Sequence, residues 1–283
     1  MIAITSPQNP HIKRVIKLND RRARDEARQT IVEGVREVRL ALSRGIVPVE
    51  AYLCPELIDG AEAEAAARHL RAIAASGMTE LFLVSPKVFT KMAYRGESGG
   101  LLLVIAYRSH RLDELQFRGG PFIVVVEEAE KPGNLGAVLR TADAAGADAV
   151  IVPSPEGGRG TTEGRGTDLH NPNVIRASLG AYFTVPVVAA SNEQAIAWLR
   201  TRGIAIVAAT PAAEALYTAT DLSGPVAVAI GSEAWGLSDT WLAAADRQVH
   251  IPMAGAVDSL NLSASAALLM YEVVRQRATP IKP

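Results

Sequence analysis

Three short segments in the C-terminal half of the chain carry side chains that could support chemistry. The first follows an apolar run at residues 122–127 and contains Asn134 and Arg140. The second follows another apolar run and contains Gly231 and Glu233. In open α/β sheets, ligands bind at the carboxyl ends of the strands. Both segments are therefore predicted to lie at a binding site, where Gly231 would let a ligand approach the backbone closely.

The third segment opens the last predicted helix and is rich in short polar side chains. Ser259 is predicted as the N-cap of this helix and Asn261 as a polar residue of its first turn. Two apolar stripes follow within residues 259–277, so the helix is expected to be covered on two sides. Polar groups at a buried helix start need hydrogen-bond partners, which a bound ligand or substrate could provide.

Each segment also has a purely structural interpretation. Asn134 could cap a helix, and Arg140 could be a solvated side chain. Glu233 could be an exposed residue of an ordinary turn, beside a packed Trp235. The functional interpretation requires that segments distant in the chain converge on one pocket.

The elements that must position these segments are predicted from apolar runs and helical periodicity. Strands are expected at 122–127, 149–152, 185–188, 204–208, 226–230 and 248–251, and helices at 134–145, 172–181, 193–202, 238–245 and 259–277. Strands that alternate with helices indicate an α/β domain, which is predicted over residues 121–283.

The N-terminal part has the same alternation and predicts a smaller α/β domain over residues 1–107, with a parallel or mixed sheet. Its helices are expected at 10–28, 35–43, 62–75 and 86–92, and its strands at 30–32, 49–53, 81–84 and 101–106. The polar residues 108–120 end in two glycines before Pro121 and are predicted to form a linker.

The formal net charge is −1, but the basic residues are unevenly distributed. Residues 1–45 contain ten Lys and Arg against five Asp and Glu, a balance of 10 − 5 = +5. Neutralising nucleic-acid phosphates releases counterions, so this segment is a candidate phosphate-contacting surface. A solvated helix face would account for the same charges. Because only 5% of residues are aromatic, a base-stacking sheet platform is disfavoured.

Length and composition exclude several classes of protein. With 283 residues, of which 48% are hydrophobic, the chain can form two domains with buried cores. Its apolar runs fall far short of the roughly 20 residues that a membrane-spanning helix needs, and its first residues lack the apolar core of a secretory signal. The single Cys54 excludes an intramolecular disulfide and a cysteine-based zinc site, and no metal is predicted. These features favour a cytoplasmic protein.

In their order and approximate spacing, the three segments resemble the signature motifs of the SpoU (TrmH) family of RNA ribose 2′-O-methyltransferases, within the SPOUT superfamily. The resemblance covers about residues 121–277 and is carried by residues 130–140, 168–178, 228–237 and 251–266. Residues 1–107, notably 31–38 and 91–96, resemble the ribosomal-protein-L30-like (L30e-like) substrate-binding domain that often precedes it.

The resemblance implies an α/β protein in which a smaller L30e-like α/β domain precedes a C-terminal SPOUT α/β trefoil-knot domain. It implies S-adenosyl-L-methionine as cofactor, contacted at the backbone of Gly231, Ile251 and Leu260. The family pattern places five side chains in the catalytic site: Asn134, Arg140, Glu233, Ser259 and Asn261. It further implies an RNA substrate, a homodimer formed through the C-terminal domain and no membrane partner.

Methyl transfer to a ribose hydroxyl needs in-line positioning and removal of the hydroxyl proton. Arg140 matches the catalytic arginine of the family. Because a guanidinium stays protonated, we expect Arg140 to hold the target phosphate and stabilise the developing alkoxide, while the proton leaves by another route such as the RNA phosphate. The L30e-like domain favours 23S ribosomal RNA as substrate, and transfer RNA is the alternative. The Gly/Arg-rich residues 156–167 are predicted to form a mobile loop, with no task or ordered by RNA.

Two further classes of function compete with this interpretation. A nucleotide-dependent enzyme on a conventional doubly wound sheet would carry G-x-G-x-x-G after a strand, or G-K-[ST], and neither is present. A non-catalytic RNA-binding protein would be expected to lack Arg140, Glu233 or Asn261, yet the chain has all three.

Overall fold

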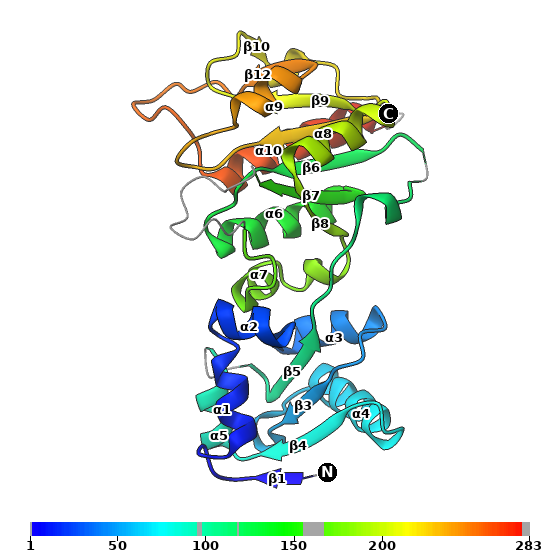
Figure 1. The fold of residues 1–283 in the computed structure, drawn as a ribbon, viewed down its shortest axis with the longest axis vertical. Coiled ribbons are helices and arrows are strands. Elements are labelled where there is room, and N and C mark those ends of the chain that lie inside the picture. The colour runs from blue at the N-terminus through cyan, green and yellow to red at the C-terminus, as the bar shows by residue number, and fades with distance from the viewer. Residues whose placement is uncertain (1, 95–97, 118, 155–166, 279–283) are drawn as a thin grey trace. The chain divides into compact units, whose positions relative to one another are not determined.

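The computed structural model describes residues 2–94, 98–117, 119–154 and 167–278, in which the chain forms two compact units (Figure 1). The first unit comprises Met1–Arg108 together with His170–Thr184, and the second comprises Ser109–Leu169 and Val185–Pro283. A short segment from the middle of the sequence thus packs with the N-terminal unit. Most of the predicted 156–167 loop lies outside the described residues.

The first unit contains a five-stranded mixed sheet with the order β1-β4-β3-β5-β2. β4 pairs in parallel with β1 and β3, whereas β5 pairs antiparallel with β2 and β3. The sequence missed β1, which has only three residues, two of them exposed. The strands are β1 (Ile2–Ile4), β2 (Gln29–Glu33), β3 (Glu50–Leu53), β4 (Glu80–Val84) and β5 (Leu101–Ala106).

The helices of this unit depart from the sequence prediction at one important place. The expected helix at 10–28 is two helices, because Asp20 caps a new helix by accepting a hydrogen bond from the Ala23 N–H. Arg24 is buried and donates to the carbonyls of Leu18 and Asn19, so this basic side chain is structural and does not contact phosphate. The helices are α1 (Pro10–Lys17), α2 (Arg21–Ala27), α3 (Val35–Ser43), η1 (Pro55–Leu57), α4 (Ala61–Ala75), α5 (Pro86–Met92), α7 (Pro172–Ala177) and η3 (Ala181–Phe183).

The expected helix at 172–181 is also interrupted. α7 ends at Ala177, and Gly180 takes a left-handed backbone conformation, φ 85°, before η3 begins. A Cβ at position 180 would lie 2.6 Å from the Leu40 side chain, which makes glycine necessary there.

The second unit contains a seven-stranded sheet, β10-β12-β9-β11-β6-β7-β8, in which the neighbouring strands pair in parallel. β6 and β11 are central and entirely buried, as parallel strands covered on both faces should be. The two-residue β10 was not predicted. The strands are β6 (Phe122–Val126), β7 (Ala149–Ser154), β8 (Val187–Ser191), β9 (Ala205–Ala209), β10 (Ala215–Leu216), β11 (Val226–Ile230) and β12 (Arg247–His250).

The register of β6 and β11 brings two of the predicted segments together. Val226 pairs with Phe122 at one end and Ile230 with Val126 at the other, so the two strands finish level. The residues that follow each strand therefore leave the sheet at the same edge, where ligands bind in such folds.

Helices cover both faces of this sheet. α8 and α9 pack in one apolar cluster with alternate residues of β6 and β11, and α6 and α10 pack against each other. The helical elements are η2 (Leu112–Glu114), α6 (Pro132–Ala145), α8 (Asn192–Thr201), η4 (Tyr217–Ala219), α9 (Asp239–Ala244) and α10 (Leu262–Arg277). Throughout the described ranges, none of the helices has both the length and the apolar character to cross a membrane.

α10 differs from its prediction in where it begins. It starts at Leu262 and its N-cap is Asn261, whose side chain accepts from the Ser263 N–H, so the predicted cap at Ser259 is wrong. One side of the helix is buried, and the other exposes Leu268 and Tyr271.

Candidate active site

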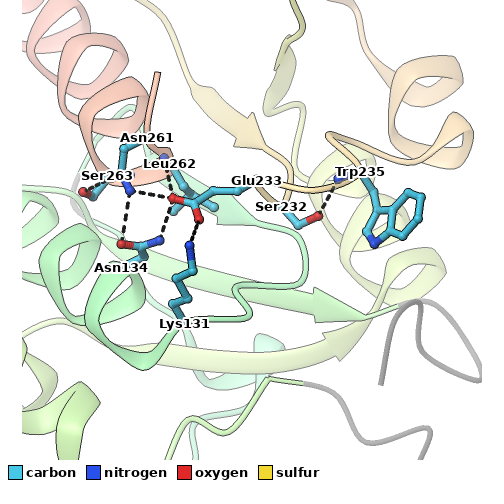
Figure 2. A network of polar contacts seen from close by, with 8 residues as sticks. All are labelled: Lys131, Asn134, Ser232, Glu233, Trp235, Asn261, Leu262 and Ser263. Carbon is cyan, nitrogen blue, oxygen red and sulfur yellow. Dashed lines mark hydrogen bonds and ion pairs between the residues drawn. The ribbon is translucent and has the colours of Figure 1, made fainter. Parts of the chain in front are cut away.

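The carboxylate of Glu233 is the centre of a polar network that joins the three predicted segments (Figure 2). It accepts hydrogen bonds from Lys131 Nζ at 2.7 Å, Asn134 Nδ2 at 2.8 Å and Asn261 Nδ2 at 2.5 Å. The Leu262 N–H donates to the same carboxylate at 3.4 Å. Asn134 lies 99 positions from Glu233 in the chain and Asn261 lies 28 positions from it, yet both contact its carboxylate.

This network keeps Glu233 ionised. The pKa of Glu233 lies below its ordinary value, chiefly because Lys131 donates a hydrogen bond to it, and this outweighs the opposing effect of partial burial. The Leu262 N–H, the charge of Lys131 and the Asn134 amide lower this pKa further. The same hydrogen bond raises the pKa of Lys131. Glu233 is therefore an anchor for hydrogen-bond donors and a poor proton acceptor near neutral pH.

The network also sets the orientation of both asparagine amides. Asn134 donates to Glu233 and presents its Oδ1 to Asn261 Nδ2 at 3.4 Å. Asn261 Oδ1 accepts from the Ser263 N–H and hydroxyl, which leaves its NH2 group for the carboxylate. A carboxylate only accepts hydrogen bonds, so neither amide can be reversed without losing these contacts.

A cavity of about 460 Å³ adjoins the network, and Glu233 and Leu262 belong to both. It is lined by Gly231, Ile251 and Leu260, the three residues that the family pattern assigns to the cofactor. Ser259 also lines it. Residues 231–237 connect β11 to α9 and form much of the cavity wall. We call this segment the 231–237 loop.

Glycine at position 231 is also required by the packing of the chain itself. A Cβ at this position would lie 1.9 Å from the carbonyl carbon of Gly236 and 2.1 Å from the nitrogen of Leu237. The close approach is thus made by the chain itself, where the 231–237 loop folds back on its own first residue. A side chain at position 231 would force the backbone of the cavity wall to move.

The side chain of Trp235 is exposed, so the structural alternative in which it packs in the interior does not hold. Its side chain is 64% exposed, although its backbone is fixed by a hydrogen bond from its N–H to Ser232 Oγ at 3.1 Å (Figure 2). The Gly236 N–H donates to the Ser232 carbonyl, which completes a tight turn. The loop therefore has an ordered backbone and one exposed aromatic side chain.

Two predicted catalytic residues lie outside the network. Arg140 is exposed on α6, six residues after Asn134 and about 9 Å further along the helix axis. Ser259 lies in the exposed segment before α10. The premise that this helix start is buried is wrong, because Ser259 and Asn261 are both exposed, and Asn261 finds its partners within the protein.

Sequence analysis did not select two members of the network. Lys131 sits within the first motif, immediately before the Pro132 that opens α6, and its contact with Glu233 spans 102 positions. Ser263 orients Asn261 from the first turn of α10. A lysine within the first motif, shortly after the predicted strand at 122–127, was the available signal for Lys131.

Comparison with known proteins places the chain in a family. Residues 121–271 match the model of the SpoU rRNA Methylase family, and residues 9–103 match the MRM3-like substrate binding domain. The chain belongs to the SpoU rRNA methylase family. The resemblance of the three motifs is thereby confirmed.

Individual relatives extend over almost the whole chain. The 23S rRNA (guanosine-2′-O-)-methyltransferase RlmB of Shewanella oneidensis is 34% identical, and the match covers 82% of this chain and 96% of that protein. A crystal structure of an RNA 2′-O ribose methyltransferase is 40% identical over 98% of this chain and 99% of that one, with a TM-score of 0.78.

The fold is also that of a cofactor-bound relative. The AdoMet-bound rRNA methyltransferase from Sinorhizobium meliloti is 27% identical and covers 98% of both chains, with a TM-score of 0.85. The predicted α/β class, with a SPOUT methyltransferase unit preceded by a smaller α/β unit, is confirmed.

Proposed function

We propose that this protein transfers the methyl group of S-adenosyl-L-methionine to a ribose 2′-hydroxyl of ribosomal RNA, most directly 23S ribosomal RNA. The observation that carries the proposal is the convergence of Asn134, Glu233 and Asn261 beside a cavity large enough for the cofactor. The family and the relatives named above support the same reaction.

The cavity suits the cofactor in size and in the kind of groups that line it. Gly231, Ile251 and Leu260 offer backbone groups to the adenosine and amino-acid parts of S-adenosylmethionine. Apolar side chains such as Leu237 and Val249 form the rest of a largely apolar wall. When bound, the cofactor supplies a methyl group activated by the positive charge on sulfur.

In this proposal Glu233 acts by holding donors in place. As an ionised carboxylate it fixes Asn134 and Asn261, whose amides would contact the substrate ribose and the bound cofactor. Ser259, exposed at the cavity wall, supplies a hydroxyl to the same space. These groups lower the barrier through positioning, since they hold the ribose oxygen in line with the methyl carbon and sulfur.

Arg140 contacts the RNA in this proposal. Its exposure on α6 leaves the guanidinium available to a phosphate of the target nucleotide. As the new O–C bond forms and the C–S bond breaks, Arg140 stabilises the charge that develops on the ribose oxygen. The hydroxyl proton leaves through the RNA phosphate, because the guanidinium stays protonated and Glu233 is already an acceptor of several hydrogen bonds.

The remaining expectations concern assembly and RNA recognition. We propose that residues 1–107 bind the RNA substrate, that residues 108–120 link them to the methyltransferase domain at 121–283, and that this domain holds a trefoil knot. The exposed Leu268 and Tyr271 of α10 support a homodimer through this domain, because a second copy would cover them. We also propose a cytoplasmic location, because ribosomal RNA is the proposed substrate.

The reaction is tested by methylation with S-adenosylmethionine labelled in the methyl group. We expect label in ribosomal RNA that survives alkaline hydrolysis as dinucleotides, because a 2′-O-methyl group blocks cleavage at that ribose. Label in mononucleotides would indicate base methylation and contradict the proposal. Transfer RNA, tested in the same assay, is the alternative substrate, and preferential labelling of it would overturn the choice of ribosomal RNA.

A further inference from the structure

A second glutamate, Glu127, is not among the residues that line the cavity, and within the described residues it takes no part in the network of Glu233. It follows directly after β6 and is only 2% exposed. Its carboxylate accepts from Asn192 Nδ2 at 2.7 Å and from the backbone N–H of Ser238 at 2.7 Å. Asn192 in turn accepts a hydrogen bond from Trp241 Nε1 at 3.0 Å, so the group is satisfied on all sides.

The contacts of Glu127 fall at the two ends of the 231–237 loop. Its backbone N–H donates to the carbonyl of Ile230 at 2.9 Å, immediately before the loop. Its carboxylate accepts from the N–H of Ser238, immediately after the loop. One residue therefore fixes both the entry and the exit of the segment that forms much of the cavity wall.

The contact at Ser238 is difficult to replace. Ser238 is 1% exposed, and its N–H donates to the Glu127 carboxylate. Without that carboxylate, the N–H would lose this acceptor while remaining buried. A buried donor left unsatisfied is unfavourable, and a shift of the loop toward solvent would relieve it. Gly231 transmits such a shift, because it lies directly against Gly236 and Leu237.

We propose that Glu127 is a positioning residue, which holds the 231–237 loop in the shape that binds the methyl donor. This inference deepens the proposed function and rests on it for the identity of the ligand. Glu127 does not touch the cavity's contents; it acts through the loop, whose residues 231–233 and 235–237 line the cavity.

The test is the Glu127→Gln variant of the full chain. Asn192 and Ser238 donate to different oxygens of Glu127, and in glutamine one of these positions is an NH2 donor, so one of the two contacts is lost. If the loop then holds its binding shape about one-tenth of the time, affinity falls by the same factor. We expect the Kd for S-adenosylhomocysteine, measured by calorimetry, to rise about ten-fold. We expect the KM for S-adenosylmethionine to rise with it, and kcat at saturation to stay within about two-fold.

A second readout reports on the loop without any ligand. In Glu127→Gln, hydrogen exchange should accelerate at the amides of residues 231–238, while α10 keeps its protection. Glu272→Gln is the matched control, because Glu272 is also a buried carboxylate, 6% exposed, but is bonded by Arg275 and Gln276 within α10. The control should lose stability without changing the Kd.

The outcomes separate the inference from the function on which it rests. An unchanged Kd and unchanged exchange at 231–238 in Glu127→Gln would overturn the role of Glu127. Failure of the wild-type protein to bind S-adenosylhomocysteine would instead contradict the proposed function, and the exchange experiment would still test the loop. If Glu127→Gln does not fold, Glu127→Asp tests the same contacts, since it keeps the charge and shortens the side chain by one methylene.

Discussion

The two sides of the 231–237 loop use the same chemical group for different purposes. On the open side, the Glu233 side chain is 26% exposed and accepts mainly from side chains that could rearrange, those of Lys131, Asn134 and Asn261. On the buried side, Glu127 accepts from a backbone N–H and from an asparagine that is itself 1% exposed. The comparison indicates that the open side serves substrate chemistry and the buried side serves the shape of the cavity.

Burial explains why these roles differ. Water can replace a lost partner at Glu233, so removing one donor there costs little structure. Glu127 is only 2% exposed and is shielded from bulk water, so a lost partner must be compensated by a movement of the chain. Variants on the open side should therefore change turnover, whereas variants on the buried side should change cofactor affinity.

The largest effect is expected at Arg140, which would sharpen the comparison as a residue that contacts the RNA and not the cofactor. Arg140→Ala should lower kcat about 100- to 1000-fold, the usual cost of removing one group that stabilises transition-state charge. The Kd for S-adenosylhomocysteine should not change, because Arg140 does not line the cavity.

Arg140→Lys is the matched variant, since it keeps the charge but loses bidentate geometry. It should also be impaired in steady-state methylation of ribosomal RNA. Near-full turnover in Arg140→Lys would contradict the proposal that Arg140 holds a phosphate through two parallel hydrogen bonds.

An intermediate effect is expected from Gly231→Ala, which alters the loop from within. Because the new Cβ would meet the backbone of Gly236 and Leu237, the cavity wall must shift. Overpacking of this kind costs about 1–3 kcal/mol, so the Kd for S-adenosylhomocysteine should rise about 5- to 150-fold. Gly255→Ala is the control, because a Cβ there meets nothing within 4 Å. An unchanged Kd in Gly231→Ala would contradict the claim that the shape of the 231–237 loop determines how the cavity binds the cofactor.

The smallest effect is expected from pH, and it concerns the open side. Because the pKa of Glu233 is lowered in the folded protein, its network is intact above the ordinary value of 4.5 and is lost only as pH falls below that value. The kcat for methylation should therefore be flat between pH 5 and pH 8 as far as Glu233 is concerned. A transition in this range that is abolished by Glu233→Gln would show that Glu233 titrates there and would contradict its role as a permanent anion.

Much of the scaffold could be predicted from local sequence. The apolar runs predicted β5, β11 and α5 with the bounds found in the structure, because strands and helices of this kind depend on patterns within a few residues. The break between α1 and α2 was missed, because it depends on Asp20 as a cap and on Arg24 buried beneath it. These contacts are local, three to six residues apart in the chain, but they join polar groups, and apolar periodicity does not report them.

In the site, too, some residues could be predicted from the sequence and others could not. The motifs identified Asn134, Glu233 and Asn261 as residues that could meet, and the structure brings them together. The start of α10 was misplaced because Ser259 and Asn261 are both good caps, and the contact of Asn261 with Glu233 selects between them. Glu127 was not singled out, because its partners lie 65 and 111 residues away in the chain.

The most direct test of the account is a crystal structure of the protein with S-adenosylmethionine bound. We predict the cofactor in the cavity lined by Gly231, Ile251 and Leu260, with its methyl group directed toward the side chains gathered by Glu233. A cofactor bound elsewhere, or one whose methyl group points away from Asn134 and Asn261, would contradict the claim that these groups form a single site.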